Sequence, residues 1–347
     1  MKAALFYGSR DVRVEEVELP ELKDDQVQIE VAWCGICGSD KHGYERPTRP
    51  GARLPYIIGH EFSGTVVKVG ANAKRIKVGD RVVANPIFPC GECDSCKRGY
   101  VNLCRNLTMY GLNPIAGGAM AEYTNVPEFV VEKIPDNLPL DEAAVVEPAG
   151  IAFHALRISS FKPGDDVAVF GAGPIGLLQL AELKAAGAKQ IFCIAHSEAR
   201  QKKALEFGAT CVLDPDKDDV VGTILAATGG GVMVSFDLAG ANQTLDLAIK
   251  VLKPGGSQVV YPALPGGALD LNVGDLIRKE ANIIGSQCTL DEFKMVPLLI
   301  AKGSFDVKGV ITKKIYLDDI VAEGYETLMT DKSHLKILIT PNLKNLD

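Results

Sequence analysis

The chain has 347 residues, of which 47% are hydrophobic, so it is long enough to bury a large core and to divide into two domains. Its formal net charge of −7 argues against a nucleic-acid binder, which needs a clustered basic surface. No signal-peptide pattern follows Met1 and no apolar run reaches membrane-spanning length, so we expect a soluble, cytoplasmic protein. Nine cysteines in such a chain predict metal or thiol chemistry rather than a disulfide framework.

Short segments of alternating apolar and polar residues fill the first part of the chain. They cover 12–17, 27–32, 62–70 and 78–83, and Pro, Gly and Asp interrupt them. Alternation with a period of two is typical of half-buried antiparallel strands. No helical segment long enough for a βαβ unit precedes Pro139. We therefore expect a closed or partly closed β-barrel here.

Four cysteines lie close together in a polar stretch between residues 85 and 110. They are Cys90, Cys93, Cys96 and Cys104. Thiolates at this spacing can close a tetrahedron around zinc, and a site with four such ligands has no open coordination position. The alternative is a set of buried, inert thiols, which the charged neighbours Glu92 and Asp94 disfavour. We predict a structural zinc lobe that takes no part in chemistry.

Reactive groups are therefore expected elsewhere. Cys37 closes the motif Cys34-Gly-Ile-Cys37 after a predicted strand, and His60 directly precedes Glu61. Thiolate and imidazole are suitable zinc ligands, and Glu61 or Glu147 could add an oxygen while leaving room for water or substrate. Cys34 and Cys37 could instead form a redox pair. The spacing alone leaves both interpretations open.

A glycine-rich turn joins an apolar strand at 167–170 to a helical segment that ends near residue 186. In this Gly-x-Gly-x-x-Gly pattern the first glycine allows a tight turn, the second lets the backbone approach a pyrophosphate, and the third lets the helix pack closely on the strand. The N-terminus of the helix then faces the phosphates. The residues predicted to bind the cofactor here are Gly171, Gly173, Pro174, Ile175 and Gly176.

Apolar and helical runs alternate from Asp165 to Gln287. Strands are expected near 190–195, 211–213, 232–237, 257–261 and 281–285, with helices between them. Together with 167–170 they predict an α/β, doubly wound, parallel six-stranded sheet of the Rossmann type. We place the domain boundaries near 150 and 290, with residues 291–347 returning to the first domain.

The second strand of this sheet departs from the usual pattern. Such a strand ends in Asp or Glu when the ribose 2′-hydroxyl of NAD is bound. This one continues as Ala195-His-Ser197-Glu198-Ala-Arg200. Ser197 can hydrogen-bond to a 2′-phosphate and Arg200 can pair with it bidentately, so NADP is favoured over NAD. In the alternative, Glu198 turns inward to bind the diol of NAD.

The stretch between residues 42 and 60 is expected near the mouth of a substrate pocket. Arg46, Arg49 and Arg53 could hold a phosphate, or could form an ordinary solvated basic loop. Four polar side chains could contact a polyol or could equally belong to the core or to turns: Tyr44, Asn85, Tyr110 and Asn113.

Taken together, the motifs resemble the zinc-containing medium-chain dehydrogenases over essentially the whole chain. They are Gly35-Ile-Cys37-Gly-Ser39-Asp40-x-His42, Gly59-His60-Glu61, the four-cysteine lobe, Val-Glu147-Pro and Gly-Ala-Gly-Pro-Ile-Gly. Glu147, where liver-type alcohol dehydrogenases have cysteine, makes the chain more similar to the polyol (sorbitol) and butanediol dehydrogenases. The resemblance implies a GroES-like β-barrel catalytic domain joined to the Rossmann domain.

The resemblance also implies a mechanism. Zinc on Cys37 and His60 would bind the substrate hydroxyl and lower its pKa, and Ser39 and His42 would relay its proton to solvent. Glu61 and Glu147 compete for a further ligand position in the family. Asp40 is expected to orient the site rather than to ligate. Lys336 matches a basic position that approaches the cofactor pyrophosphate in relatives.

The function predicted is zinc-dependent oxidation of a polyol or vicinal secondary alcohol to the ketone with NADP, or alternatively NAD. Rival assignments are a phosphopolyol dehydrogenase of the arabitol-phosphate or galactitol-phosphate type, a butanediol dehydrogenase and a threonine dehydrogenase. Rivals of other classes are a zinc-stabilised NADP(H) sensor and a thiol redox protein. As in relatives, 257–261 and 269–272 are expected to form a sheet edge that pairs across a twofold axis, giving a homodimer or homotetramer.

Overall fold

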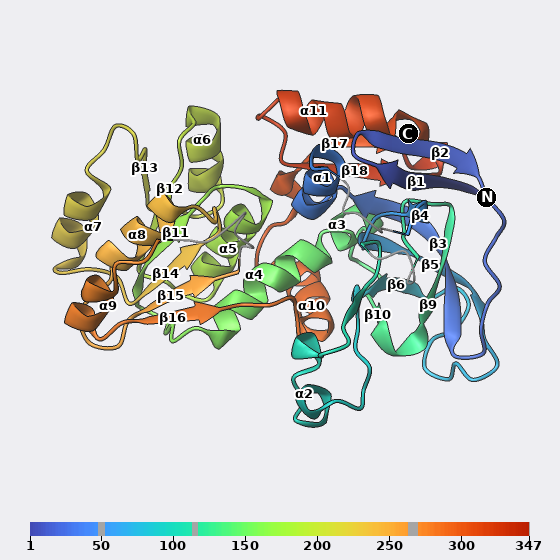
Figure 1. The fold of residues 1–347 in the computed structure, drawn as a ribbon, viewed down its shortest axis with the longest axis horizontal. Coiled ribbons are helices and arrows are strands. Elements are labelled where there is room, and N and C mark those ends of the chain that lie inside the picture. The colour runs from blue at the N-terminus through green and yellow to red at the C-terminus, as the bar shows by residue number, and fades with distance from the viewer. Residues whose placement is uncertain (48–52, 113–116, 263–269, 347) are drawn as a thin grey trace. The chain divides into compact units, whose positions relative to one another are not determined.

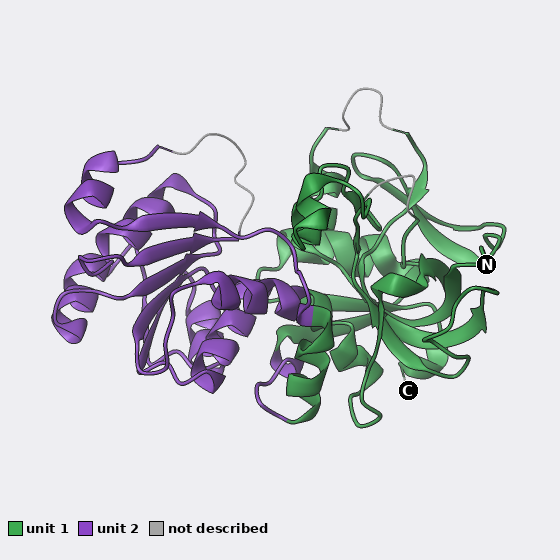
Figure 2. Ribbon diagram, turned by 90° about the horizontal axis from the view of Figure 1, so that it is seen from below, with its two compact units in different colours: residues 1–147, 293–302, 310–347 green, residues 148–292, 303–309 purple. Residues whose placement is uncertain are grey.

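The computed structural model describes residues 1–47, 53–112, 117–262 and 270–346 (Figure 1). The chain forms two compact units (Figure 2). Unit 1 comprises residues 1–147, 293–302 and 310–347, and unit 2 comprises 148–292 and 303–309. Within the described ranges, no helix is both long and apolar enough to cross a membrane.

Unit 1 is built mainly from antiparallel strands, as the alternating segments predict. A seven-stranded sheet has the order β10-β6-β5-β3-β18-β17, with β9 also paired to β3, and a smaller sheet has the order β2-β1-β4. The strands are β1 (Lys2–Gly8), β2 (Asp11–Glu16), β3 (Gln26–Gly35), β4 (Tyr56–Ile57), β5 (Glu61–Val69), β6 (Arg81–Ala84), β7 (Ile87–Phe88), β8 (Thr108–Met109), β9 (Tyr123–Pro127), β10 (Val131–Lys133), β17 (Ile311–Tyr316) and β18 (Lys336–Thr340).

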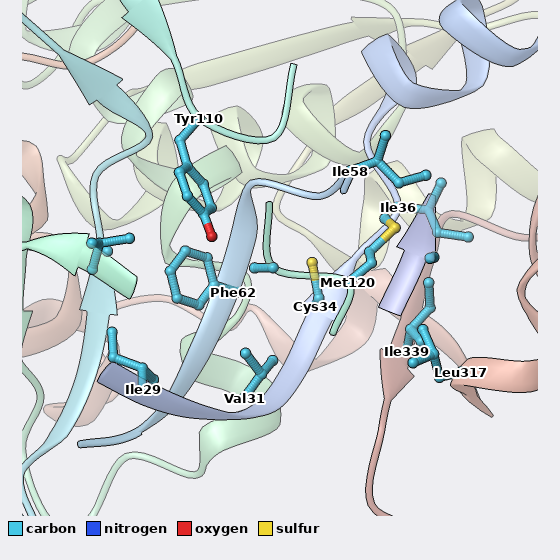
Figure 3. Close-up of a cluster of buried hydrophobic side chains, with 14 of the residues drawn as sticks. Ile29, Val31, Cys34, Ile36, Ile58, Phe62, Tyr110, Met120, Leu317 and Ile339 are labelled. Carbon is cyan, nitrogen blue, oxygen red and sulfur yellow. The ribbon is translucent and has the colours of Figure 1, made fainter. Parts of the chain in front are cut away.

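Short helices accompany these strands. They are α1 (Gly38–Glu45), α2 (Asp94–Lys97), α3 (Leu140–Ala143), α10 (Val296–Ala301), a π-helix (Ile320–Tyr325) and α11 (Glu326–Thr330), and α4 (Val146–Ile158) begins in unit 1 and continues into unit 2. Inward-facing side chains of β3, β5 and β18, among them Ile29, Phe62 and Ile339, pack into one apolar cluster (Figure 3). This core fixes the ends of β3 and β5, where the site described below lies.

Unit 2 contains the predicted six-stranded sheet, in the order β13-β12-β11-β14-β15-β16 with every neighbouring pair parallel. This is the doubly wound order in which a dinucleotide lies at the carboxyl ends of the strands. The strands are β11 (Asp166–Phe170), β12 (Gln190–Ile194), β13 (Cys211–Leu213), β14 (Val234–Asp237), β15 (Gln258–Tyr261) and β16 (Asn282–Gly285). The helices are α5 (Pro174–Ala185), α6 (Glu198–Glu206), α7 (Val220–Thr228), α8 (Asn242–Lys250) and α9 (Val273–Lys279).

The prediction of the sheet edge was wrong for 257–261. That segment is β15, which pairs with β14 on one side and with β16 on the other, so its backbone groups are already used. The edge strand is β16. Of the second predicted edge segment, Leu269 lies outside the described residues and 270–272 form no strand.

Candidate functional site

The start of α1 places four predicted site residues. Cys37 is the N-cap residue of this helix, and its backbone N–H donates to Oδ2 of Asp40 at 2.9 Å. Asp40 and Tyr44, four residues apart, form the buried face of the helix. Ser39 and His42, three residues apart, lie on the exposed side. The helix therefore turns a buried carboxylate inward and holds the two predicted relay residues at the surface.

Strand pairing brings His60 and Glu61 to Cys37. β3 and β5 are antiparallel, and their register places Gly35 opposite Glu61. Ligand atoms of Cys37, His60 and Glu61 all lie within 4.8 Å of one another. A Cβ on Gly35 would overlap a carboxylate oxygen of Glu61, so the close approach requires glycine. A thiol, an imidazole and a carboxylate thus converge at the end of the barrel strands.

His60 and Asp40 form a buried pair beside this cluster. Nδ1 of His60 lies 3.6 Å from Oδ1 of Asp40, and neither atom has a hydrogen-bond partner among the described residues. Burial alone would lower the pKa of His60, but the charges of Asp40 and Cys37 raise it well above its usual value. A carboxylate behind one ring nitrogen orients the other nitrogen toward a metal. The geometry agrees with the predicted orienting role of Asp40.

Glu61 is held by a lysine from the far end of the chain. Nζ of Lys336 lies 2.7 Å from Oε1 and 2.5 Å from Oε2 of Glu61, and it donates to the carbonyl oxygen of Ile36 at 3.1 Å. Both side chains are almost fully buried. Burial lowers the pKa of Lys336, but Glu61 more than offsets this and the pKa is raised. These contacts of Lys336 are with the metal-ligand cluster, so its predicted approach to the pyrophosphate stays a prediction.

Glu147 lies in the first turn of α4 and is buried. Burial raises its pKa to about 7, while the charge of His60 acts in the opposite direction. Glu61, Lys336 and Asp40 also act on this carboxyl, so it lies near the same cluster. A soft thiolate, an imidazole and buried carboxylates are the donor set that zinc accepts with one position open. The residues present therefore fit a catalytic zinc.

The four cysteines of the predicted lobe are also brought together. The Sγ atoms of Cys90 and Cys104, and those of Cys93 and Cys96, are 3.5 Å apart, and those of Cys93 and Cys104 are 4.0 Å apart. A tetrahedron with Zn–S bonds of about 2.3 Å has sulfur separations of about 3.8 Å. Backbone N–H groups of Cys96 and Arg105 lower the pKa of Cys93 to about 6. Preformed spacing and a stabilised thiolate fit structural zinc.

Cys34 does not belong to either metal cluster. It lies in the apolar core of unit 1, where Figure 3 shows it among Val31, Phe62 and Met120. Burial raises the pKa of its thiol well above the usual value. A thiol that stays protonated and inaccessible is a poor nucleophile, so the structure contradicts the Cys34–Cys37 redox pair.

The glycine-rich turn of unit 2 has the geometry expected of a dinucleotide loop. Gly171 has φ of +103°, which favours glycine, and a Cβ on Gly176 would overlap the carbonyl oxygen of Gly171. Among the described residues, no heavy atom outside its immediate chain neighbours lies within 4 Å of the position of a Cβ on Gly173, so this face of the loop has room for a ligand. Pro174 occupies the first turn of α5, followed by Ile175. The residues fit a pyrophosphate at the N-terminus of α5.

Arg200, which follows β12 in the chain, contacts this glycine-rich loop. Ser197 is the N-cap of α6, where its Oγ accepts from the backbone N–H of Arg200 at 3.4 Å. Nη1 of Arg200 donates to the carbonyl oxygen of Ala172 at 3.3 Å, and burial lowers the pKa of the guanidinium. Glu198 is exposed. A cation is thus positioned against the glycine-rich loop.

Sequence reasoning missed a carboxylate at this place. Asp216, which follows the neighbouring strand β13, lies with Oδ2 2.8 Å from Nδ1 of His196. The signal was available, because side chains after adjacent parallel strands meet at one edge of a sheet. The prediction considered an acid at the end of β12 alone and not after the neighbouring strand.

Of the four side chains left open between a polyol contact and a place in the core or a turn, the three described ones lie in the core or a turn. Tyr44 is buried and stacks on Tyr325 with ring centroids 4.7 Å apart, and Tyr110 is buried against Thr124. Oδ1 of Asn85 accepts from the backbone N–H of Ile87 and shapes a turn. Arg46 and Arg53 are exposed. Asn113 and Arg49 lie outside the described residues.

Two family models match the chain, one in each part of it. Residues 23–136 match the alcohol dehydrogenase GroES-like domain, and residues 174–301 match zinc-binding dehydrogenase. The chain is 41% identical to (R,R)-butanediol dehydrogenase of Bacillus subtilis (strain 168) over 99% of this chain and 100% of that protein.

Solved structures show the same similarity. The crystal structure of 2R,3R-butanediol dehydrogenase from Bacillus subtilis has a TM-score of 0.92 and 39% identity, and covers 98% of this chain and 99% of that one. A zinc-binding dehydrogenase from Sinorhizobium meliloti 1021, solved bound to NADP, has a TM-score of 0.90 and 32% identity over 98% of this chain and 99% of that one.

Proposed function

This chain belongs to the zinc-containing medium-chain dehydrogenases, and we propose that it oxidises a secondary hydroxyl of a vicinal diol or polyol to the ketone, with NADP as the preferred hydride acceptor. The observation that carries the proposal is the convergence of Cys37, His60 and a buried carboxylate beside Ser39 and His42. The similarity to butanediol dehydrogenase supports the substrate class. A redox sensor would not need exposed relay residues next to a metal-ligand cluster.

Residues of this chain would have separate roles in the oxidation. Cys37, His60 and one buried glutamate would hold zinc, which when bound supplies a Lewis acid that lowers the pKa of the substrate hydroxyl. Ser39 would accept the hydroxyl proton and His42 would pass it to solvent. Burial, then Arg46 and Lys41, lowers the pKa of His42 below 6.5. The imidazole is therefore neutral at pH 7 and can accept the proton.

We assign the further ligand position to Glu147 rather than to Glu61. Both oxygens of Glu61 are neutralised by Lys336 at 2.5 and 2.7 Å, so a metal would compete with an ion pair already formed. The pKa of Glu147 near 7 reflects a buried carboxyl that has no ion pair of this kind with any of the described residues. A cation next to Glu147 would offset the cost of burying its charged carboxylate.

The preference for NADP is supported by the end of β12. No acid occupies its last positions, and Arg200 instead approaches the glycine-rich loop through Ala172 at 3.3 Å. A guanidinium at this place can pair with a 2′-phosphate. The solved relative from Sinorhizobium meliloti 1021 is bound to NADP.

A homodimer through unit 2 accompanies this function. In the part of the chain that the structure describes, β16 pairs with a strand on one side only, β15, and its residue Ile283 is exposed. Nearby segments add Leu271, Val273 and Ile277, of which Ile277 is 71% exposed. Exposed apolar side chains and a free edge of the sheet each favour pairing with a second copy.

Zinc content and turnover test the proposal together. The purified chain is analysed for zinc, then assayed with NADP and NAD on butanediol, sorbitol, xylitol, arabitol, threonine and the available polyol phosphates. About two zincs per chain and NADP-linked ketone formation from a diol or polyol are expected. One zinc, retained by the cysteine lobe, with no turnover of any alcohol would refute the catalytic assignment. Selective turnover of a phosphate would implicate the exposed Arg46 and Arg53.

A further inference from the structure

Helix α1 carries the relay residues of the proposed site, but its own sequence stabilises it poorly. It has eight residues, of which Gly38 and Gly43 are glycines. Isolated helices shorter than about 12–15 residues are marginal in water, and glycine weakens them further. Contacts from the rest of unit 1 must therefore hold this helix in place. The buried side chains through which they act are Asp40 and Tyr44.

Tyr44 is held by two consecutive residues from the C-terminal part of unit 1. Its ring stacks on that of Tyr325, with centroids 4.7 Å apart and planes 14° apart. Its hydroxyl donates to Oε1 of Glu326 at 2.9 Å. Tyr325 ends the π-helix and Glu326 begins α11, which lies beside α1 in Figure 1. Turns of the π type are rare and occur frequently at functional sites.

The turn between β1 and β2 holds the same tyrosine by its backbone. The backbone N–H of Arg10 donates to the carbonyl oxygen of Tyr44 at 2.9 Å, and Oγ of Ser9 donates to it at 3.3 Å. Nη1 of Arg10 also lies 3.5 Å from Oε1 of Glu326, but both side chains are largely exposed, so this ion pair adds little. Three segments far apart in the sequence therefore meet at the last turn of α1.

The segment that holds Tyr44 also lies close to the metal-ligand cluster. Tyr325 is 1% exposed, and burial raises the pKa of its hydroxyl well above the usual value, with the charge of Asp40 adding to the shift. A Cβ on Gly324 would lie 2.8 Å from Cδ1 of Ile36, the residue before Cys37. The π-helix thus packs directly on the chain that leads into α1.

We propose that Tyr325 and Glu326 are positioning residues, which act on the metal-ligand cluster through Tyr44. They fix the place and rotation of α1, and with them the ligand Cys37 and the orienting carboxylate of Asp40. The effect on the metal rests on the proposed zinc site. A merely structural role would lower the stability of unit 1 without changing the ligand geometry in protein that remains folded.

Hydrogen exchange of the α1 amides, followed by mass spectrometry on the zinc-loaded full chain, tests the anchoring. Losing an aromatic pair or a hydrogen bond of this kind changes an opening equilibrium by about two- to tenfold. Tyr325→Leu and Tyr44→Phe should each speed exchange of residues 38–45 by about this factor. Glu326→Ala should add nothing to Tyr44→Phe, because both changes break one hydrogen bond. Unchanged exchange in every variant would overturn the proposal.

The visible spectrum of cobalt exchanged for zinc tests the effect on the metal, because its bands depend on ligand geometry. The spectrum of Cys37→Ala is subtracted to remove the contribution of the cysteine lobe. Tyr325→Leu should alter the remaining bands and weaken cobalt binding by about tenfold, whereas Tyr325→Phe, which keeps the ring, should preserve both. Glu326→Ala, at a partly exposed position, gives the same test if Tyr325→Leu does not fold. Faster exchange with unaltered cobalt bands and affinity would limit these residues to a structural role and refute the proposal.

Tyr110→Leu is the matched control, because Tyr110 is also buried in unit 1 but its ring contacts are Phe62 and Phe88. It should lower Tm without changing the cobalt bands or the exchange of α1. An equal change in this control would assign the effect to general loosening of unit 1. If the unsubstituted protein gives the spectrum of Cys37→Ala, the proposed zinc site fails, and the exchange rates alone decide whether Tyr325 anchors α1.

Discussion

The ion pair between Lys336 and Glu61 should be essential for the stability of unit 1. The ammonium lies 2.5 and 2.7 Å from the two carboxylate oxygens, and the side chains are 3% and 1% exposed. Lys336→Met keeps the aliphatic length and removes the charge, so a carboxylate is left buried without its cation. Breaking a buried pair in this way costs about 3–5 kcal/mol.

The loss of folding free energy in Lys336→Met should depend on pH, because a proton can neutralise the Glu61 carboxyl that is left without its cation. A glutamate in an unfolded chain titrates near pH 4.3, so holding the proton in the folded state costs about 1.4 kcal/mol for each pH unit above that. The loss is then about 1 kcal/mol at pH 5 and about 3.7 kcal/mol at pH 7. Stability of the variant, relative to the unsubstituted protein, is thus retained at low pH and lost as pH rises.

Urea unfolding followed by tryptophan fluorescence measures this directly. The single tryptophan, Trp33, is buried on β3 of unit 1, so it reports on the unit that holds the pair. With a slope of about 3 kcal/mol per molar urea, the midpoint should fall by about 1 M at pH 7. The control, Glu61→Gln with Lys336→Met, should recover most of the loss and abolish its pH dependence. A loss below about 1 kcal/mol at pH 7, or an equal loss at pH 5 and pH 7, would refute the reasoning.

Three further predictions concern the relay, the lobe and unit 2. His42→Gln should lower kcat for alcohol oxidation by about 100-fold and remove the acid limb of the pH profile. That limb lies below pH 6.5 because burial lowers the pKa of His42. An unchanged limb would exclude His42 from the proton relay. Cys104→Ser should yield one zinc fewer per chain and proteolytic cleavage within the lobe, whereas an unchanged zinc content would contradict a four-cysteine site. Burial raises the pKa of Glu182 well above its usual value, so folding is favoured below the unfolded value near 4.3 and disfavoured as pH rises. Glu182→Gln should therefore stabilise the protein by about 1–3 kcal/mol at pH 8 and little at pH 4 in thermal unfolding; equal effects at both pH values would contradict this.

The cysteine lobe and the nucleotide-binding sheet could be predicted because their signals are local. Cys90 to Cys104 form one loop, and spacing alone decides whether four thiols can meet. The turn from Gly171 to Gly176 sits between an apolar strand and a helix, and helical and strand periods then alternate in order. The observed strand order is the usual one for a doubly wound sheet of this type.

The pairing of Glu61 with Lys336 could not be predicted in the same way, because 275 residues separate them. Residues 291–347 are predicted to return to the first domain, but that prediction does not say that β18 lies between β3 and β17. The same limit explains the error over the sheet edge, since no local pattern distinguishes β15 from β16. For Tyr44 and Tyr110 the sequence left a pocket and the core open, because an aromatic residue with a hydroxyl suits both equally well.

The charge balance of the site bears on which ion it holds. Asp40, Glu61 and Glu147 are three buried acids, and Lys336 is the buried lysine that faces them. If all four are charged and His60 is neutral, as a metal ligand has to be, two negative charges remain uncompensated in a region where an unpaired charge is costly. Protonation of Glu147, whose pKa is raised to about 7, is one way to reduce that excess.

A divalent cation held by Cys37, His60 and Glu147 would remove the excess without a proton. Zinc binding should therefore release protons and become tighter as pH rises from 6 to 8. Calorimetric titration of zinc into the chelator-treated protein in buffers of different ionisation enthalpy measures the protons released, and Glu147→Gln should release fewer; an equal number would assign the ligand position to Glu61 instead.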